Sequence, residues 1–243
     1  RPVSDLRIFV LDLETVRNGL AWTPPETRPN ALAPAPCWDI VCIGGMLLTA
    51  SGEAETTQVK ATLKIVSGAS PIEAVQTVAR LSADGATLVS FNGRSFDFPV
   101  MESTLIRAGA SAPSLFRKSV RGRYDAGHQD VCDYLSNHGS TAPISQDLWS
   151  RAVGLPGKGA VSGGDVAAMM AEGRTAEVNA YCLADVLQLA IIYLDTVRAA
   201  GGLSAWLTEA LEAAAWEAAR ENPALEWVWS CPRATRHLEK QAA

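Results

Sequence analysis

The most constraining feature of this chain is an apolar run at residues 6–13, LRIFVLDL, which carries an aspartate near its end and is followed by a glutamate. A nearly continuous run of branched and aromatic residues is typical of a strand buried on both faces of a sheet. Asp12 lies inside that run, where an unpaired carboxylate is costly, so it needs a partner, and a cation is a suitable one. Side chains at positions i and i+2 of a strand point to the same face, so Glu14 is predicted to converge with Asp12.

A second short strand is also followed by an acidic residue. The segment ATLVSFN at 86–92 is apolar and leads through a turn at Gly93 to Asp97, where a helix is predicted to begin. Pro99 in the first turn and Gly109 after the last turn agree with these helix boundaries. An Asp near a helix N-terminus is also an ordinary cap, so Asp97 alone does not identify a site.

The third acidic position lies on the most helical part of the chain, residues 175–199. Tyr181 and Asp185 are four positions apart there, which puts the phenol and the carboxylate on one face of the helix. In isolation this spacing indicates a core tyrosine beside a surface aspartate. Here it follows two other acidic motifs, and we interpret the three motifs as parts of one site.

Carboxylates in this arrangement suit metal-assisted hydrolysis of a phosphodiester. Two divalent ions about 3.5–4 Å apart neutralise the phosphate and both the attacking and the leaving oxygen. Carboxylate oxygens are the ligands that hard ions such as Mg²⁺ prefer. The acidic motifs therefore predict a nuclease site with two divalent metal ions, Mg²⁺ or Mn²⁺.

The ordered motifs DLE, NGRSFD and YxxxD resemble those of the DEDD exonuclease superfamily, in its tyrosine-bearing (DEDDy) subgroup. The flanking segments WDIVCIGG and GLPGKGAVSGGDV are similar to those of predicted 3′–5′ exonucleases that resemble the proofreading domain of B-family DNA polymerases. The resemblance covers about residues 6–199. The sister subgroup has a histidine five positions before its last aspartate, where this chain has Ala180, so the histidine type is not expected.

The resemblance implies a role for each motif residue. Asp12, Glu14 and Asp185 would hold the ion that activates the attacking water. Asp12 and Asp97 would hold the second ion. Tyr181 would orient the water rather than deprotonate it, because an ordinary phenol has a pKa near 10. Three further residues would contact the terminal nucleotide: Thr15, Asn92 and Phe96.

The net charge of −5 is opposite to what phosphate binding usually requires, but basic residues cluster after the second motif. No acidic residue occurs from Ser103 to Tyr124. We predict that this segment follows the substrate backbone; a solvated basic loop is the alternative. The predicted phosphate contacts are Arg117, Lys118, Arg121 and Arg123.

The glycine-rich run GLPGKGAVSGGDV is not a Walker A loop. That motif requires Ser or Thr after its lysine, whereas Gly159 follows Lys158, and the preceding segment is predicted to be helical rather than a strand. Lys158 is still a candidate to contact the substrate backbone.

The other long loop, residues 17–37, is rich in Pro. Trp22 lies within it and Trp38 directly follows it. Such tryptophans could stack on the bases of a single strand, but packing of the loop against the body of the protein is their commoner fate.

Composition agrees with one globular domain spanning residues 1–243. The chain has 48% apolar and 19% charged residues, with no apparent signal peptide and no apparent apolar run of membrane-spanning length. Its five cysteines are scattered without a CxxC pair, which favours reduced thiols and a cytoplasmic location.

The predicted fold is α/β, with helices packed on a mixed central sheet, and it resembles the ribonuclease H-like fold. Three early strands joined by short connections predict an antiparallel meander, and a helical crossover leads from it to a fourth strand. A fifth strand is expected within residues 112–133, a further helix at 203–221, and an unassigned tail at 222–243. The first four strands and the crossover helix are predicted at 6–13, 39–49, 56–64, 86–92 and 71–83.

The leading hypothesis is a metal-dependent 3′–5′ exonuclease that acts on single-stranded or frayed DNA ends. A 3′–5′ exoribonuclease would use the same site, because discrimination depends on contacts to the 2′ position. A catalytically inactive nucleic-acid-binding or scaffold module is the alternative from another class, and the intact acidic residues argue against it. Nucleic acid is the expected partner and a membrane is not; the motifs specify no protein partner.

Overall fold

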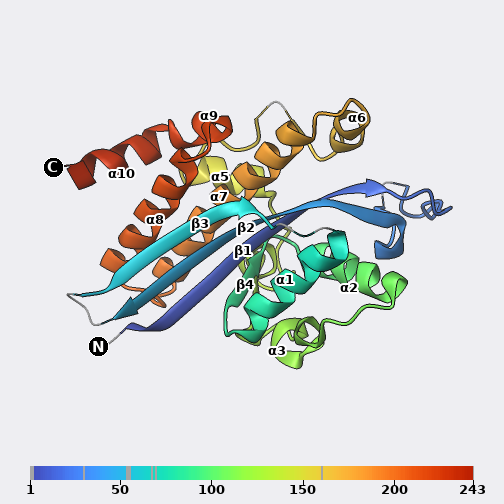
Figure 1. Cartoon of the computed structure of the whole chain (residues 1–243), viewed down its shortest axis with the longest axis horizontal. Helices are drawn as coiled ribbons and strands as arrows, with labels where there is room; N and C mark the ends of the chain where they lie inside the picture. Colours follow the sequence, from blue (N-terminus) through green and yellow to red (C-terminus); the bar gives the residue numbers. More distant parts are fainter. Residues whose placement is uncertain are drawn as a thin grey trace.

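The computed structural model describes residues 3–29, 31–52, 56–66, 68, 70–159 and 161–242. Its centre is a five-stranded sheet with the order β3-β2-β1-β4-β5 (Figure 1). The strands are β1 (Val3–Arg17), β2 (Trp38–Gly52), β3 (Gln58–Ile65), β4 (Thr87–Ser90) and β5 (His128–Asp130). β1, β2 and β3 form an antiparallel meander, and β4 and β5 continue the sheet in parallel to β1. The predicted mixed sheet is therefore confirmed.

Helices enclose the sheet on both sides, and most of their bounds agree with prediction. Residue bounds of the long helices are α1 (Pro71–Ala83), α2 (Asp97–Ala108), α7 (Thr175–Ala199) and α8 (Ala205–Arg220). Shorter elements connect them: η1 (Ala35–Cys37), η2 (Pro113–Phe116), α3 (Lys118–Arg121), α4 (Val131–Leu135), α5 (Gln146–Ala152) and α6 (Val166–Ala171). The chain continues through η3 (Pro223–Leu225), α9 (Glu226–Trp229) and α10 (Pro232–Ala242).

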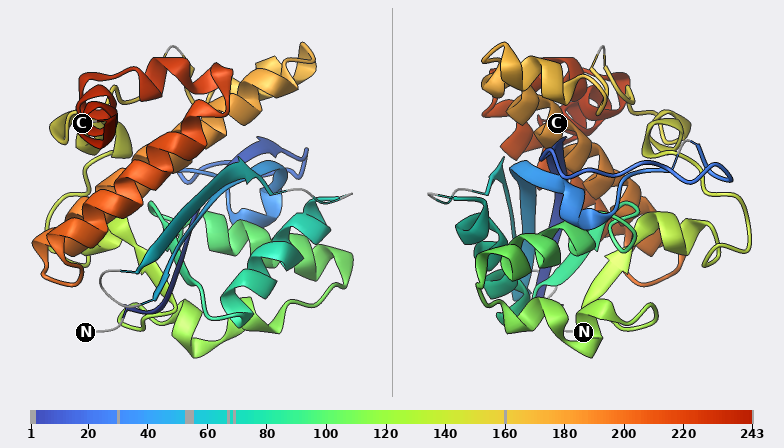
Figure 2. Two further views of the ribbon diagram at one scale, coloured as in Figure 1. Left: turned by 60° about the vertical axis from the view of Figure 1, so that its left-hand side comes forward. Right: turned by 90° about the vertical axis from the view of Figure 1, so that its right-hand side faces the viewer.

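Alternate residues of β1 face opposite layers of helices, as expected of a strand buried on both faces. Ile8 and Val10 belong to the core formed with α7 and α8, whereas Phe9 and Leu11 belong to the core formed with α1 and α2. Figure 2 shows these two helical layers on either side of the sheet. The acidic end of β1 thus lies in the interior, between the layers.

β1 extends further than predicted and stays paired with β2 up to Arg17, with a register shift between Glu14 and Thr15. Asp12 lies opposite Gly44 of β2 in this ladder. A Cβ atom placed on Gly44 would be 2.8 Å from Cys182 Sγ on α7. The absence of a side chain at this glycine therefore lets α7 pack closely across the acidic part of β1.

The expectation that the chain has no apolar run of membrane-spanning length needs a correction. Among the described residues, α7 is a helix long and apolar enough to cross a membrane by length and composition. However, 78% of its apolar window is buried inside the fold. Such burial is typical of the central helix of a globular core, since a helix that is apolar on all sides must be covered.

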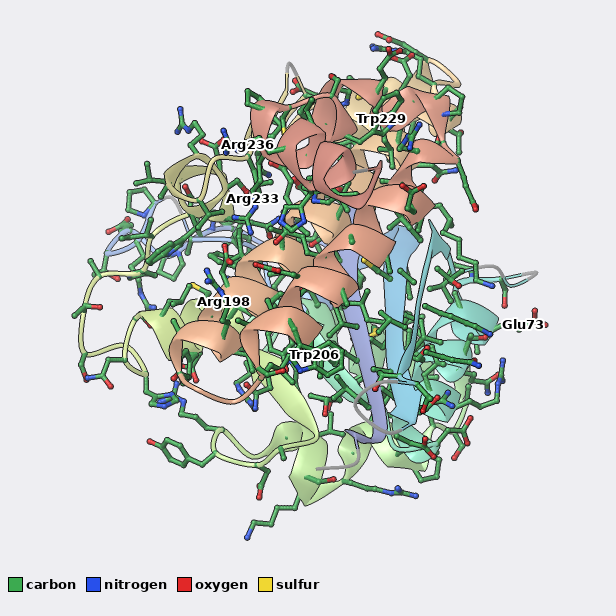
Figure 3. All side chains as sticks on the ribbon, turned by 90° about the vertical axis from the view of Figure 1, so that its left-hand side faces the viewer. Glu73, Arg198, Trp206, Trp229, Arg233 and Arg236 are labelled. Atoms are coloured by element: carbon green, nitrogen blue, oxygen red, sulfur yellow. The ribbon has the colours of Figure 1, made fainter. Side chains whose placement is uncertain are left out.

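The C-terminal tail folds back over α7 and α8. Arg233 of α10 donates hydrogen bonds to Asp195 of α7 and to Glu212 of α8, and also to the carbonyl oxygen of Val153 (Figure 3). The side chain of Glu212 is 4% exposed, so its carboxylate is well removed from water. The tail, which the sequence left unassigned, is helical from Pro232 to Ala242.

Candidate active site

The three acidic motifs meet at one pocket of about 640 Å³. β1 contributes two acidic residues, the turn after β4 contributes the asparagine of the second motif, and α7 contributes the tyrosine and the last aspartate. The predicted site residues that line the pocket are Asp12, Glu14, Thr15, Asn92, Phe96, Lys158, Tyr181 and Asp185. Segments far apart in sequence are therefore brought together as the motif pattern predicted.

Burial and neighbouring carboxylates strongly raise the pKa values of Asp12 and Glu14. Burial, followed by the charge of Asp185, raises the pKa of Glu14 to about 8. Burial raises the pKa of Asp12 well above its usual range, and the nearby carboxylates of Asp97 and Asp185 raise it further. Like charges held close together in a buried site need neutralisation, which a proton or a cation supplies.

Asp97 lies just behind the pocket, as the first residue of α2; the cap position of that helix is Phe96. Its side chain is buried, and burial raises its pKa to about 7, although its own backbone N–H and that of Leu13 oppose the shift. Asp97 also contributes to the raised pKa of Asp12. The second motif is thus electrostatically coupled to the first.

The donor set fits a hard divalent cation. Ligand atoms of Asp12, Glu14 and Cys182 lie within 4.8 Å of one another. A hydrogen bond with Cys42 and burial raise the pKa of the Cys182 thiol well above its usual range. The protonated thiol donates to the carbonyl oxygen of Asp12 at 3.5 Å and so supports the strand. The carboxylates are the hard oxygen donors that Mg²⁺ or Mn²⁺ would use.

Lys158 enters the site from the glycine-rich loop. Its Nζ donates to the hydroxyl oxygen of Tyr181 at 2.6 Å and lies 3.5 Å from Oδ2 of Asp185. The loop is held by its backbone, because the N–H of Lys158 donates to Asp147 Oδ1 at 2.7 Å and that of Gly157 donates to Gln188 Oε1 at 2.8 Å. The ammonium group lowers the pKa of each of Asp12, Glu14 and Asp185, against the effect of burial.

Tyr181 is held as a neutral phenol. Burial raises its pKa, and the neighbouring charges of Asp185 and Glu14 raise it further. Its hydroxyl also bonds the carboxylate of Asp185, the other helix residue of the third motif. A phenol in this environment donates and accepts hydrogen bonds but does not act as a base.

Asp130, which the sequence analysis did not identify, organises the second motif. Its buried carboxylate at the end of β5 accepts from the backbone N–H of Asn92 at 2.8 Å and of Arg94 at 2.9 Å. These bonds hold Asn92 in the left-handed region, with φ 63°. The only sequence signal was its position within residues 112–133, the range where the fifth strand was expected. Gln146, also unpredicted, donates to the carbonyl oxygen of Asp185 at 2.8 Å.

The predicted basic segment lies apart from the pocket. Among the residues that the structure describes, none of Arg117, Lys118, Arg121 and Arg123 lines it. Arg121 pairs with Glu102 at 3.2 Å, and Arg123 pairs with Asp133 at 3.1 Å. These basic residues could therefore contact only the part of a long nucleic-acid strand that extends beyond the pocket.

Trp38 begins β2 and lines the pocket beside Phe96. Its Nε1 donates to the carbonyl oxygen of Ala33 at 2.8 Å, and its ring meets that of Phe96 edge-on with centroids 5.5 Å apart. This hydrogen bond fixes the end of the long loop against the body of the protein. Trp38 thus packs as expected and also forms one wall of the pocket.

The chain resembles a known protein family. A family model described as a predicted 3′–5′ exonuclease related to the exonuclease domain of PolB matches residues 41–224. The match includes Asp97, Tyr181 and Asp185 and begins after Asp12 and Glu14. A comparison with curated proteins found no match.

Proposed function

The chain belongs to the family of predicted 3′–5′ exonucleases related to the exonuclease domain of PolB, and on that premise we propose that it is a metal-dependent 3′–5′ exonuclease of single-stranded or frayed DNA ends. The observation that carries this proposal is the meeting of three acidic motifs in one pocket, with Tyr181 and Lys158 beside them. We further assign the chain to the DEDDy subgroup and its mixed sheet to the ribonuclease H-like fold.

The residues of the pocket divide into two sets in this proposal. Asp12, Glu14, Asp97 and Asp185 would hold two divalent cations, Mg²⁺ or Mn²⁺. Such ions supply charge neutralisation at the phosphate and a nucleophilic hydroxide at neutral pH. Fixed carboxylates suit this task because they are already buried together and gain stability when a cation replaces their protons.

Tyr181 and Lys158 would act on the reacting phosphate and water. The neutral phenol of Tyr181 orients the attacking water through its hydroxyl group. The ammonium of Lys158, held against that hydroxyl, provides positive charge where charge develops on the phosphate oxygens. Asn92, Phe96 and Thr15 line the other part of the pocket and would hold the terminal nucleotide.

Digestion of end-labelled oligonucleotides tests the proposal. We expect 5′-labelled single-stranded DNA to give a descending ladder with Mg²⁺ or Mn²⁺ and no products with excess EDTA. Immediate release of the label as a mononucleotide would instead show 5′–3′ polarity, and chelator-resistant cleavage would exclude metal-dependent hydrolysis. Parallel digestion of RNA distinguishes the exoribonuclease, which would degrade RNA in preference to DNA.

Two variants separate this enzyme from an inactive binding module. Asp12→Ala and Asp185→Ala should abolish turnover and leave the metal-free protein folded or more stable, since each change relieves repulsion among clustered carboxylates. Glu209→Ala, at an exposed residue of α8, is the matched control and should keep wild-type activity. Wild-type turnover in Asp185→Ala would remove the third motif from the site.

We also propose that the protein works in a reducing compartment, the cytoplasm. All five of its cysteines are buried free thiols. Free thiols without disulfides are typical of proteins in reducing compartments.

A further inference from the structure

An apolar groove of about 510 Å³ lies next to the candidate active site. We call it the Trp227 groove; its walls include Gly159, Val161, Ala176, Ala180, Tyr181 and Trp227. Tyr181 lines both this groove and the acidic pocket, and Gly159 directly follows Lys158. The groove therefore continues from the acidic pocket on the side of Tyr181 that faces α9.

The exposure of Trp227 distinguishes it from its neighbours on α9. Val228 and Trp229 pack into the core formed with α7 and α8, whereas Trp227, which lines the groove, is 40% exposed. A Cβ atom on Gly159 would lie 3.4 Å from the nearest atom of the indole, so the loop backbone passes close to the six-membered ring of Trp227. Trp227 is therefore a partly exposed aromatic residue in the groove wall, where a flat apolar ligand could contact it.

Among the described residues that line the groove, one is acidic, and its charge is already paired. Glu177 lines it, and both of its carboxylate oxygens accept hydrogen bonds from Arg174, at 2.8 and 2.9 Å. Otherwise the named lining side chains are apolar or belong to Tyr181. The groove thus favours an uncharged planar group over a phosphate, while Lys158 lies at its boundary with the acidic pocket.

We propose that the Trp227 groove binds a nucleobase of the single-stranded substrate on the 5′ side of the scissile phosphate, stacked on the indole of Trp227. This inference rests on the proposed function. Thr15, Asn92 and Phe96 line only the acidic pocket, where the terminal nucleotide would sit. A strand whose reacting phosphate lies near Lys158 and Tyr181 then directs its next bases toward α9. Every base has a π face, so stacking holds a strand without selecting its sequence.

The first experiment compares Trp227→Ala with wild-type protein on a single-stranded oligonucleotide and on the p-nitrophenyl ester of thymidine 5′-monophosphate. Removal of a base-stacking side chain should lower kcat/KM on the oligonucleotide by about 5- to 100-fold, mainly through KM. The ester has no nucleotide on the 5′ side, so its hydrolysis should be unchanged. Trp227→Phe should restore most of the loss. An equal loss on both substrates, or no loss on the oligonucleotide, would overturn the proposal.

The second experiment removes the base instead of the side chain. Abasic sites are placed in turn at positions two to five from the 3′ end. At one of these positions, the abasic site should lower the kcat/KM of the wild-type enzyme about as much as Trp227→Ala does. The same abasic site should lower the kcat/KM of the Trp227→Ala variant hardly at all. Equal losses for wild-type and variant at all positions would show that no base contacts Trp227.

Two further variants guard against a folding defect. Trp206, in the first turn of α8, is similarly exposed at 44% but does not line the groove. Trp206→Ala should therefore leave the hydrolysis of both substrates unchanged. Ala176→Phe adds a ring at an exposed groove position and should also weaken use of the oligonucleotide while sparing the ester. If Ala176→Phe has no effect on the oligonucleotide, the groove does not hold substrate.

Binding measured without turnover separates this proposal from the proposed function. Fluorescence anisotropy of a labelled oligonucleotide in EDTA should show weaker binding by Trp227→Ala even if the wild-type protein hydrolyses neither substrate. Failure of hydrolysis alone would then contradict the exonuclease and not the groove. A change in the sedimentation of Trp227→Ala with unaltered binding would assign the groove to a contact between copies of the chain and overturn the proposal.

Discussion

The ammonium group of Lys158 donates a hydrogen bond to the hydroxyl oxygen of Tyr181 at 2.6 Å, and that hydroxyl is in turn hydrogen-bonded to the carboxylate of Asp185. A residue from a glycine-rich loop is thereby linked to both functional residues of α7. Since the phenol oxygen already accepts from Lys158, its proton is directed to an acceptor, either the Asp185 carboxylate or a water in the pocket.

This link predicts that Lys158 and Tyr181 act as a unit. Tyr181→Phe should lower kcat by about 10- to 1000-fold, because it removes one positioning hydrogen bond and keeps the ring. Lys158→Met should have an effect of similar size. The double variant should lose much less than the product of the two single losses, since each single change already breaks the same contact. Single-turnover rates measure this cycle.

Lys64→Met, at an exposed position of β3, is the control for loss of one lysine charge and should keep wild-type rates. Multiplicative effects of Lys158→Met and Tyr181→Phe would mean that the two side chains contribute independently. A wild-type rate in Lys158→Met would remove the ammonium group from the reaction.

The buried carboxyl groups predict how the stability of the metal-free protein depends on pH. The pKa of Glu14 is about 8 in the fold against 4.5 ordinarily, and that of Asp97 is about 7 against 3.8. The folded protein therefore keeps protons that the unfolded chain releases, so the free energy of unfolding falls as pH rises from about 4 to about 8. Each such group contributes at most about 1.4 kcal/mol per pH unit.

Thermal unfolding in EDTA between pH 5.5 and 7.5 measures this decline. Glu14→Gln should make the decline shallower, whereas Glu209→Gln, an exposed control, should leave it unaltered. Addition of Mn²⁺ or Mg²⁺ at pH 7.5 should restore stability in the wild-type protein. The same slope in Glu14→Gln and wild-type protein would show that Glu14 is not buried with a raised pKa.

Elements with strong local signals were predicted accurately. Residues 71–83 and 175–199 form helices with the predicted bounds, because Pro71 at the first position and long runs of helix-favouring residues are local properties. β1 continues to Arg17, beyond its apolar run, because pairing with the distant β2 stabilises polar residues in the extended form. Long-range pairing of this kind leaves little trace in the sequence.

The same distinction applies to the site. Acidic residues of the motifs could be predicted because burial of a carboxylate in an apolar strand or helix needs an explanation. Asp130 could not, since an aspartate after a short polar stretch is typical of any helix cap, and its bonds to Asn92 and Arg94 are formed only after β4 and β5 pair. The contact of Lys158 with Tyr181 likewise depends on how Asp147 and Gln188 hold the loop.

The basic segment at residues 103–124 contains arginines that form ion pairs with carboxylates and basic residues that do not, and the two groups should differ in their contribution to phosphate binding. Arg121 and Arg123 form ion pairs, whereas no ion pair is found for Arg117 or Lys118 within the described part of the chain. If the segment binds long substrates, the double change of Arg117 and Lys118 to Ala should flatten the log–log salt dependence of binding by about 0.7 per lost phosphate contact. The corresponding change of Arg121 and Arg123 should have less effect.

Fluorescence titrations of a long single strand over a range of salt concentrations give these slopes. A dinucleotide is the control substrate, since it is too short to reach the segment and its turnover should not change. If neither double variant changes the salt dependence of binding or the KM, residues 103–124 form a solvated basic loop that does not bind substrate.

The buried ion cluster at the C-terminus predicts that α10 stabilises the whole domain. Arg233 contacts Asp195 at 2.7 Å and Glu212 at 2.7 Å, and its own side chain is 14% exposed. Arg233→Met should lower the free energy of unfolding by about 3–5 kcal/mol, because it removes the guanidinium group from the buried carboxylate of Glu212 and leaves only Trp216 and His237 beside it among the described residues. Arg220→Met, which breaks the exposed pair with Glu217, is the matched control and should cost less than about 1 kcal/mol. Urea unfolding of both variants at neutral pH makes the comparison, and equal stabilities would show that the charges of Asp195 and Glu212 are solvated without Arg233.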